Sequence, residues 1–276
     1  MTDSASPPPP LPITRAGGQG VNRSFASFRC ISALILREMV TRYGRSPGGY
    51  AWAVLQPMGM ILILAVAFSL LVRVPPLGNN FILFMATGLL VFQLYSNVSA
   101  AISKSLQYSR ALLFYPAVTW IDALLARFIL NIITDLLVML LLFTVLIELA
   151  DFTLILDVKP LVLSLSLAIA LAFGIGSLNS VLFGFFPIWA NVWAILNRPM
   201  FFISGILFLY ENMPRDIQVY LWYNPLVHIV ALMRAAFYPT YDATFASPVY
   251  VLCWAVIPAF LGIMLMRRYH REILNR

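Results

Sequence analysis

Three polar side chains stand four residues apart within one long apolar stretch: Arg127, Asn131 and Asp135. On a helix that rises about 1.5 Å per residue, this spacing places all three on one face. A charge at the centre of a bilayer costs about 2.5–3.5 kcal/mol on insertion scales, so this face must meet protein or water. Gln93 and Asn97 repeat the spacing in the preceding apolar stretch. The pattern fits either an aqueous pathway for a polar substrate or a polar contact between helices.

Two further side chains could meet a polar substrate near the start of the first apolar stretch. Trp52 and Gln56 are four residues apart and therefore share a helix face. The amide of Gln56 needs a partner or water inside a membrane. Trp52 either lines a substrate path or anchors the helix at the membrane surface, as tryptophan commonly does.

Aromatic residues also gather in the last quarter of the chain, at Tyr220, Trp222 and Tyr223. Their faces could stack on sugar rings, and they fit an ordinary interfacial belt equally well. No constellation for covalent catalysis is recognisable, because the two histidines, His228 and His270, are far apart in the sequence. The pattern G-x-x-x-x-G-K-[ST], which would hold a nucleotide phosphate, does not occur.

The composition excludes a soluble protein. Of 276 residues, 61% are hydrophobic and 11% are charged, and the mean hydropathy is +0.88. A soluble domain is about one quarter charged, so the chain is an integral membrane protein. Membrane topology accounts for the net charge of +7, and no nucleic-acid partner is expected. The only cysteines, Cys30 and Cys253, have no metal-ligand spacing, so no metal site is expected.

The elements that position these residues are apolar helices. A membrane span needs about 20 apolar residues, and six stretches meet or approach this length. They are Tyr50–Val72, Phe81–Ile102, Trp120–Leu149, Leu161–Phe186, Trp193–Tyr210 and Pro248–Met266. The third is over-long and should tilt or project. Arg198-Pro199 interrupts the fifth, so an interfacial stretch followed by a short span is the alternative there. We therefore predict an all-α integral membrane protein with six transmembrane helices, in which Gly174, Gly176 and Ser177 allow close helix packing.

Lysine and arginine indicate the orientation. They are concentrated before the first span, between the second and third spans, and after the last one. Because cytoplasmic loops carry an excess of these residues, both termini are predicted to be cytoplasmic. The parts of the chain are then a disordered Pro/Gly-rich tail (1–26), an amphipathic interface helix (27–46), a six-span transmembrane domain (47–267) and a basic tail (268–276).

Two connections have their own predicted structure. Ser46-Pro47-Gly48-Gly49 should break the interface helix and turn the chain into the bilayer. In the segment 211–247, Asn224-Pro225 combines an N-cap with proline at the first helical position. The apolar run that follows, up to Pro239, is too short to span, so a re-entrant helix in the outer leaflet is predicted.

The stretch REMVTRYGRSPGGYAWAVLQP, residues 37–57, resembles the entry motif of polysaccharide-exporting ABC transporter permeases. NRPMFFISGILF (197–208) and YNPLVHIVALMRAAFY (223–238) are similar to the capsule-export branch in particular. The Pro-rich N-terminal extension is outside that family pattern, and no role is assigned to it.

The resemblance implies a homodimer whose two permeases form a channel for lipid-linked polysaccharide in the inner membrane. It also implies a separate ATP-binding subunit that carries ATP and Mg²⁺, a periplasmic polysaccharide co-polymerase and an outer-membrane export channel. Arg37, Arg42 and Arg45 become candidates for binding phosphate or acidic sugars, although simple positive-inside anchoring explains them equally well.

The resemblance assigns roles to three groups of residues. The substrate path would comprise the three arginines above with Trp52, Gln56, Gln93, Asn97, Arg127, Asn131 and Asp135. The coupling helix (103–116), which contacts the ATPase, would use Ser105, Arg110, Leu112, Leu113 and Phe114. The periplasmic gate would use Tyr220, Trp222, Tyr223, Asn224 and His228.

Other functions stay open. The same motifs fit an exporter of O-antigen or teichoic acid. A membrane enzyme acting on lipid-linked sugars would need a cluster of acids or histidines at one membrane face, and the sequence has none. A passive channel would work without a nucleotide-binding partner. The expected function is therefore that of a transporter permease subunit rather than an enzyme.

Overall fold

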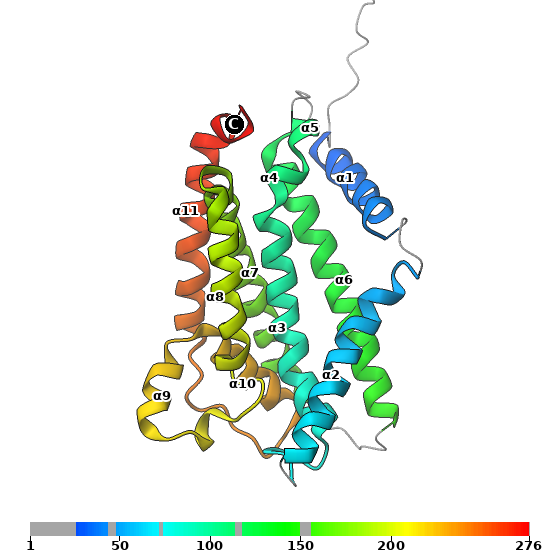
Figure 1. Ribbon diagram of the computed structural model, residues 1–276, viewed down its shortest axis with the longest axis vertical. Helices are drawn as coiled ribbons and strands as arrows, with labels where there is room; N and C mark the ends of the chain where they lie inside the picture. The colour runs from blue at the N-terminus through cyan, green and yellow to red at the C-terminus, as the bar shows by residue number, and fades with distance from the viewer. Residues whose placement is uncertain (1–25, 44–47, 72–73, 114–117, 150–155, 276) are drawn as a thin grey trace, which may run out of the picture.

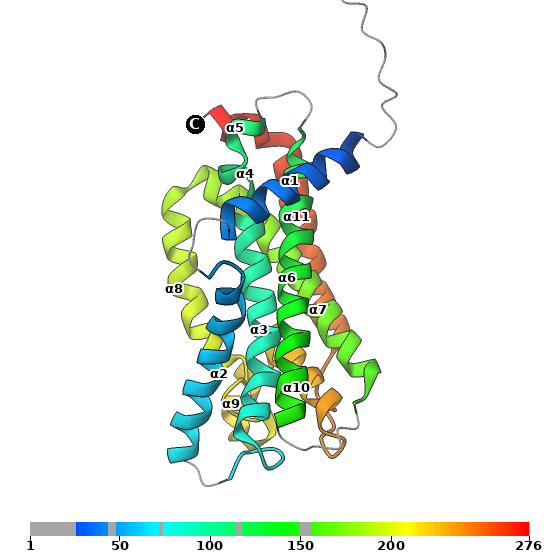
Figure 2. The ribbon, with the colours of Figure 1, turned by 90° about the vertical axis from the view of Figure 1, so that its right-hand side faces the viewer.

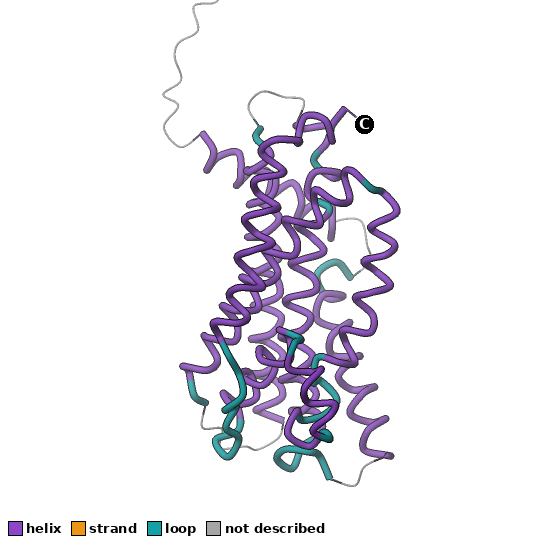
Figure 3. The backbone as a smooth tube through the Cα atoms, turned by 90° about the vertical axis from the view of Figure 1, so that its left-hand side faces the viewer, coloured by secondary structure: helices purple, strands orange, loops and turns teal. Residues whose placement is uncertain are grey.

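The computed structural model describes residues 26–43, 48–71, 74–113, 118–149 and 156–275. Helices joined by turns and loops make up these ranges, which confirms the all-α class (Figure 3). The helices are α1 (Ala26–Tyr43), α2 (Ala51–Leu71), α3 (Phe81–Ser103), α4 (Ser105–Tyr108), α5 (Arg110–Leu113), α6 (Trp120–Leu149), α7 (Val158–Phe185), α8 (Pro187–Ile203), the 3₁₀-helix η1 (Tyr210–Asn212), α9 (Arg215–Trp222), α10 (Pro225–Phe237) and α11 (Pro248–Asn275).

Five of these helices are long and apolar enough to cross a membrane: α2, α3, α6, α7 and α11. The predicted fifth span falls instead on α8, which has 17 residues. At about 1.5 Å per residue, α8 is about 25 Å long, less than the roughly 30 Å of a typical hydrocarbon core. Six crossings, the orientation of the termini, the interface position of α1 and the re-entrant position of α10 therefore stay predictions.

The predicted bounds of the fifth span, Trp193–Tyr210, were wrong. The helix begins earlier, with Pro187 at its first position, where a missing N–H costs nothing. It ends at Ile203, shortly before Gly205, whose φ of 78° cannot continue a right-handed helix. Hydropathy alone missed both signals, Pro187 at the start and Gly205 after the end, because the apolar residues continue past Gly205.

Helices α3 and α7 form the centre of the bundle (Figures 1 and 2). Helix α7 packs against α3, α10 and α11, and α3 also packs against α6 and α2. Helices α2 and α8 lie at the periphery. Only Pro57, Ile61 and Ala65 are buried in α2, and no residue of α8 is buried.

A capping residue begins α10 where the sequence predicts it. The Asn224 side chain accepts a hydrogen bond from the backbone N–H of Leu226 at 3.0 Å, and Pro225 is the first residue of α10. Asn80 and Asp157 cap α3 and α7 in the same way. Between α1 and α2, Gly48 and Gly49 have positive φ values of 94° and 42°, as a tight turn requires.

At the end of the bundle that carries α1, the chain departs from two sequence-based boundaries. The predicted coupling helix is divided into the one-turn helices α4 and α5. The predicted basic tail continues α11, and its residues Ile273 and Leu274 are buried. Residues 1–25, Arg45 and Phe114, which carry other predictions, lie outside the described residues.

The α7–α11 contact provides a test of packing. A β-carbon on Gly174 would collide with the backbone carbonyl of Ala255, which no side-chain movement can relieve. We expect Gly174→Ala to destabilise the bundle by about 1–3 kcal/mol, the usual cost of overpacking. Thermal unfolding of the purified protein would measure this. Gly59→Ala is the matched control, because a β-carbon there meets nothing within 4 Å. Equal melting temperatures for the two variants would refute the close contact.

Candidate functional site

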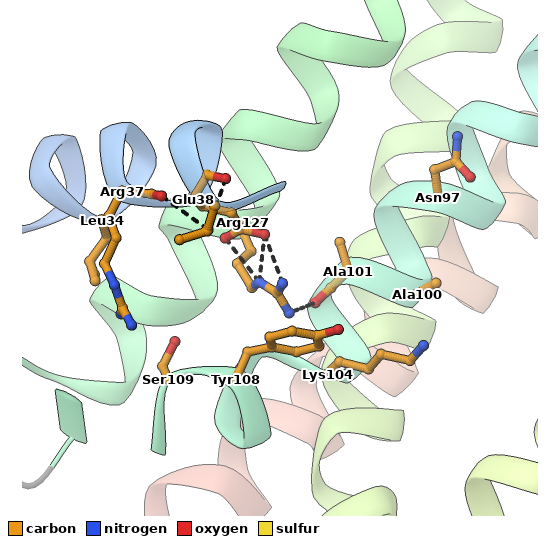
Figure 4. A pocket seen from close by; sticks show the side chains of 11 residues that line it. Leu34, Arg37, Glu38, Asn97, Ala100, Ala101, Lys104, Tyr108, Ser109 and Arg127 are labelled. Atoms are coloured by element: carbon orange, nitrogen blue, oxygen red, sulfur yellow. Dashed lines mark hydrogen bonds and ion pairs between the residues drawn. The ribbon is translucent and has the colours of Figure 1, made fainter. Parts of the chain in front are cut away.

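A cavity of about 530 Å³ lies between α1, α3, α4 and α6 (Figure 4). Its charged lining residues are Arg37, Glu38, Lys104 and Arg127, so three cations face one carboxylate. The other lining residues are Leu34, Thr41, Asn97, Ala100, Ala101, Tyr108 and Ser109. This excess of positive charge favours an anionic group in the cavity. Arg37 thus lies where the sequence-based reading expects it.

The Arg127 guanidinium is held from three sides (Figure 4). Nε donates to both carboxylate oxygens of Glu38 at 2.9 and 3.0 Å, and Nη2 donates to Oε1 at 2.7 Å. Nη1 donates to the backbone carbonyl of Ala101 at 3.3 Å. The guanidinium carbon stands 4.2 Å from the centre of the Tyr108 ring. All three nitrogens are therefore engaged within the protein, so the positive charge left for a substrate anion comes from Arg37 and Lys104.

A second cavity, of about 280 Å³, lies between α2, α3 and α6. Its lining includes five of the predicted path residues, Gln56, Gln93, Asn97, Asn131 and Asp135. Asn97 Nδ2 donates to Asp135 Oδ1 at 3.0 Å, which joins the polar faces of α3 and α6. Asn131 is 2% exposed and donates to the backbone carbonyl of Arg127 at 2.7 Å. The predicted single polar face on α6 is thus present, and it points toward protein.

A third cavity, of about 770 Å³, lies between α3 and α8 and was missed from the sequence. Six aromatic residues line it: Phe92, Tyr95, Phe183, Trp193, Phe201 and Phe202. Its polar lining residues are Ser96, Ser99, Ser103, Lys104, Asn191, Asn197 and Arg198, with no carboxylate among the lining residues. The Asn197 amide donates to the Ser96 hydroxyl at 3.3 Å, which connects α8 to α3. Rings, amides and cations suit a polyhydroxylated ligand that carries negative charge.

The three cavities meet along one ridge of α3. Phe92, Ser96 and Ala100 share a face of α3, Lys104 directly follows the end of that helix four residues on, and all four line the third cavity. Ala100 and Lys104 also line the first cavity, and Phe92 and Ser96 also line the second. Asn97, beside this ridge, lines both the first and the second. The sequence signal for this shared face was the spacing of small and polar residues in an otherwise apolar helix.

Of the three remaining predicted path residues, one lies elsewhere and the side chains of the other two are not described. Trp52 is 58% exposed and lines none of these three cavities. Arg42 belongs to α1, but its side chain, like Arg45, lies outside the described residues. The assignment of all three to a substrate path stays a prediction.

The predicted gate residues divide into an exposed and an enclosed group. Tyr220 and Tyr223 are exposed, at 79% and 61%. His228 is fully buried, where its Nδ1 accepts from the Ser247 N–H at 3.2 Å, and its Nε2 lies 2.8 Å from the Trp222 carbonyl. Because Nδ1 accepts, Nε2 must carry the proton and donate. In this arrangement His228 positions neighbouring groups and does not itself reach solvent.

Other contacts hold the same aromatic cluster. Asn224 is buried, and its amide donates to the Ile203 carbonyl at 3.1 Å, which connects the start of α10 to the end of α8. Trp222 packs against Tyr250 with ring centres 4.8 Å apart. The Tyr250 hydroxyl donates to the Tyr223 carbonyl at 2.7 Å.

Arg234 is the residue that sequence reasoning undervalued most. No role was predicted for it, yet it is 2% exposed. Nη1 donates to the Phe208 carbonyl at 2.8 Å and Nη2 to the Ile206 carbonyl at 2.7 Å, while the guanidinium stacks 4.0 Å from the Phe84 ring centre. Arg234 therefore fastens the loop after α8 to α3 and α10.

The Tyr241 hydroxyl donates to the Glu211 carboxylate at 2.9 Å in the loop region near Arg234. Burial and this carboxylate raise the pKa of Tyr241, so the phenol remains a neutral donor.

The predicted coupling residues that the structure describes lie at the α1 end of the bundle, where Ser105 is buried. Ser105 lies 3.4 Å from the Ser180 hydroxyl of α7, which anchors α4. Arg110 is exposed, whereas Leu112 and Leu113 are half-buried. Arg110 also lines a cavity of about 370 Å³ with residues of α4, the α7–α8 turn and the end of α11.

The Asn97–Asp135 bond provides a test of the polar faces. We expect Asn97→Leu and Asp135→Leu each to destabilise the protein by about 1–3 kcal/mol, because each leaves a polar group without its partner. The double variant should lose about 1 kcal/mol less than the sum of the two. Thermal unfolding of all four proteins in lipid nanodiscs gives this difference. Strict additivity would show that the two side chains do not interact.

A model of the ABC-2 type transporter family matches residues 29–238. The polysialic acid transport protein KpsM of Escherichia coli is 33% identical over 245 residues, which cover 89% of this chain and 95% of that protein. The capsule polysaccharide export inner-membrane proteins CtrC of Neisseria meningitidis and BexB of Haemophilus influenzae are 26% and 24% identical. Each of those matches covers 89% of this chain and 92% of the relative. The resemblance noted in the sequence is confirmed, and this chain belongs to the ABC-2 type transporter family.

Proposed function

We propose that this chain is the inner-membrane subunit of an ATP-driven exporter of capsular polysaccharide. The observation that supports this most directly is the set of three cavities that meet along the Phe92–Lys104 ridge of α3. The names of the relatives point to the same substrate class, because KpsM is described as a polysialic acid transport protein and CtrC and BexB as capsule export proteins.

The lining of the cavities suits a long, hydrated polymer. Amides and hydroxyls can exchange hydrogen bonds with sugar hydroxyls, and aromatic faces can slide along sugar rings. Many weak contacts let a polymer advance, whereas one tight site would hold it. In this proposal, the polymer is linked to a lipid, and Arg37 and Lys104 receive its phosphate or the first acidic sugar.

The proposal includes partners. Two copies of this chain form the channel, and each binds a separate subunit that hydrolyses ATP with Mg²⁺. A periplasmic co-polymerase and an outer-membrane channel receive the polymer. The exposed apolar faces of α2 and α8, with side chains such as Ile63 and Ile195, are available to contact a second copy or lipid.

Neutralising the cations of the third cavity tests the substrate path. Lys104→Gln and Arg198→Gln should each lower polymer export about tenfold, because a hydrogen bond to a charged group contributes about 1.5–3 kcal/mol. Surface polymer would be quantified in cells that depend on this chain and normalised to membrane abundance. Arg215→Gln is the matched control, since this exposed cation on α9 lines none of the cavities described above.

Two results would contradict the proposal. Normal export from both variants at normal abundance would remove the third cavity from the path. Polymer movement that continues without nucleotide would indicate a passive channel instead.

Contact with the ATP-binding subunit can be tested at the exposed side of α5. Arg110→Glu and Ala111→Asp place negative charge on this surface without touching the core, and we expect each to reduce co-purification of the ATPase at least about tenfold. Leu113 is a poorer choice because it packs partly against the core. Arg215→Glu, at the opposite end, should retain the ATPase. Full retention by both α5 variants would place the contact elsewhere.

A further inference from the structure

We infer that Arg127 transmits movement of α4 to α1, acting as a positioning residue rather than as a substrate contact. The inference rests on the proposed function, in which α4 and α5 face the ATPase and α1 borders the entry to the substrate path. We call Arg127 with its partners Glu38, Ala101 and Tyr108 the Arg127 junction (Figure 4).

The Arg127 junction joins four helices through one side chain. Arg127 belongs to α6, Glu38 to α1, Ala101 to α3 and Tyr108 to α4. The bond to Glu38 uses both carboxylate oxygens and is therefore directional as well as charged. The Tyr108 ring lies against the guanidinium, where the negative face of an aromatic ring attracts a cation.

The partners of Arg127 differ in how firmly they are held. Ala101 lies within the central helix α3. Helix α4 is anchored by Leu106, which is 2% exposed, and by Ser105 against Ser180 of α7. Helix α1 packs chiefly against α6, and each of its described side chains is exposed or half-buried. Of the four helices, α1 is therefore the one that can move at least cost.

A displacement of α4 must change the Arg127 junction. The guanidinium is planar and its three nitrogens have fixed directions, so it cannot follow the Tyr108 ring and keep its geometry to Glu38 and Ala101. Either the Glu38 bond shifts and α1 moves with it, or that bond breaks and α1 is released. Both outcomes change the cavity of about 530 Å³ that α1 and α4 border together. The position of α1 would thereby report the state of the ATPase contact.

A purely structural role predicts something different. If Arg127 only fastens α1 to α6, the Tyr108 ring is incidental, and its loss should leave the movement of α1 unchanged. The two roles can be separated because Glu38 and Tyr108 approach the guanidinium from different helices.

The experiment measures the distance between spin labels on α1 and α6 in the complex with its ATPase, in lipid nanodiscs. Labels are placed at Ala33→Cys and Leu140→Cys, two exposed positions outside the cavities, after both native cysteines are changed to serine. The distance is compared between the nucleotide-free complex and the complex trapped with ATP and vanadate. Polymer exported per ATP hydrolysed is measured in parallel.

In the parent we expect the label distance to change on trapping. Tyr108→Leu should abolish this change and lower polymer per ATP at least about fivefold, whereas Tyr108→Phe, which keeps the ring, should retain both. The exchange Glu38→Arg with Arg127→Glu should keep the nucleotide-free distance because the ion pair survives. It should still lose the change on trapping, because a carboxylate neither donates to the Ala101 carbonyl nor stacks on the Tyr108 ring.

The outcomes separate the inference from the proposed function. The inference is overturned if the distance between the two labels stays the same when the parent complex is trapped with ATP and vanadate. It is also overturned if this distance changes fully in Tyr108→Leu. A full change of the label distance in the variant that combines Glu38→Arg with Arg127→Glu also overturns the inference. If the distance changes as expected but no polysaccharide is exported, the substrate proposal is wrong and the Arg127 junction stands.

Discussion

A polar side chain inside an apolar membrane needs a polar partner, and this need decides which faces of α3 and α6 meet. Asn97 and Asp135 bond across the two helices, and Asn131 bonds to the backbone of its own helix. Once these groups are satisfied, the remaining amides and hydroxyls face cavities on either side of α3. The same requirement that fastens the bundle therefore also creates the polar space through which a sugar polymer could pass.

Two arginines show the same requirement at opposite ends of the bundle. Arg127 meets a carboxylate and is partly accessible, with 11% of its side chain exposed. Arg234 is enclosed and binds two backbone carbonyls and an aromatic face. An ion pair can exchange partners as a substrate or neighbouring helix moves, whereas the removal of Arg234 would leave two buried carbonyls without donors. The Arg127 end is thus suited to rearrangement and the Arg234 end to rigidity.

The sequence predicted most of the helices and much of the polar face, and the reasons for the failures are physical. Four-residue spacing identified Arg127, Asn131 and Asp135 because helix periodicity is local information. The third cavity could not be foreseen, because it depends on where α8 lies against α3, and that placement is not local information. Arg234 was misjudged because its partners are backbone carbonyls, which leave no trace in the sequence.

The engagement of Arg127 was also invisible, since Glu38 is distant in the chain. A lone basic residue in an apolar stretch indicates that a partner exists and says nothing of which one. Trp52 lies on the exposed surface of α2, and its assignment to a substrate path stays a prediction.

The peripheral position of α8 has a consequence for how such exporters diversify. Because no residue of α8 is buried in the bundle, substitutions on its cavity-facing side cost little folding free energy within one subunit. Asn191, Asn197 and Arg198 can therefore change with the chemistry of the polymer while the α3–α7–α11 core stays constant. Natural selection could then adapt one scaffold to new capsules by changing only the cavity-facing side of α8, without first having to acquire stabilising mutations elsewhere.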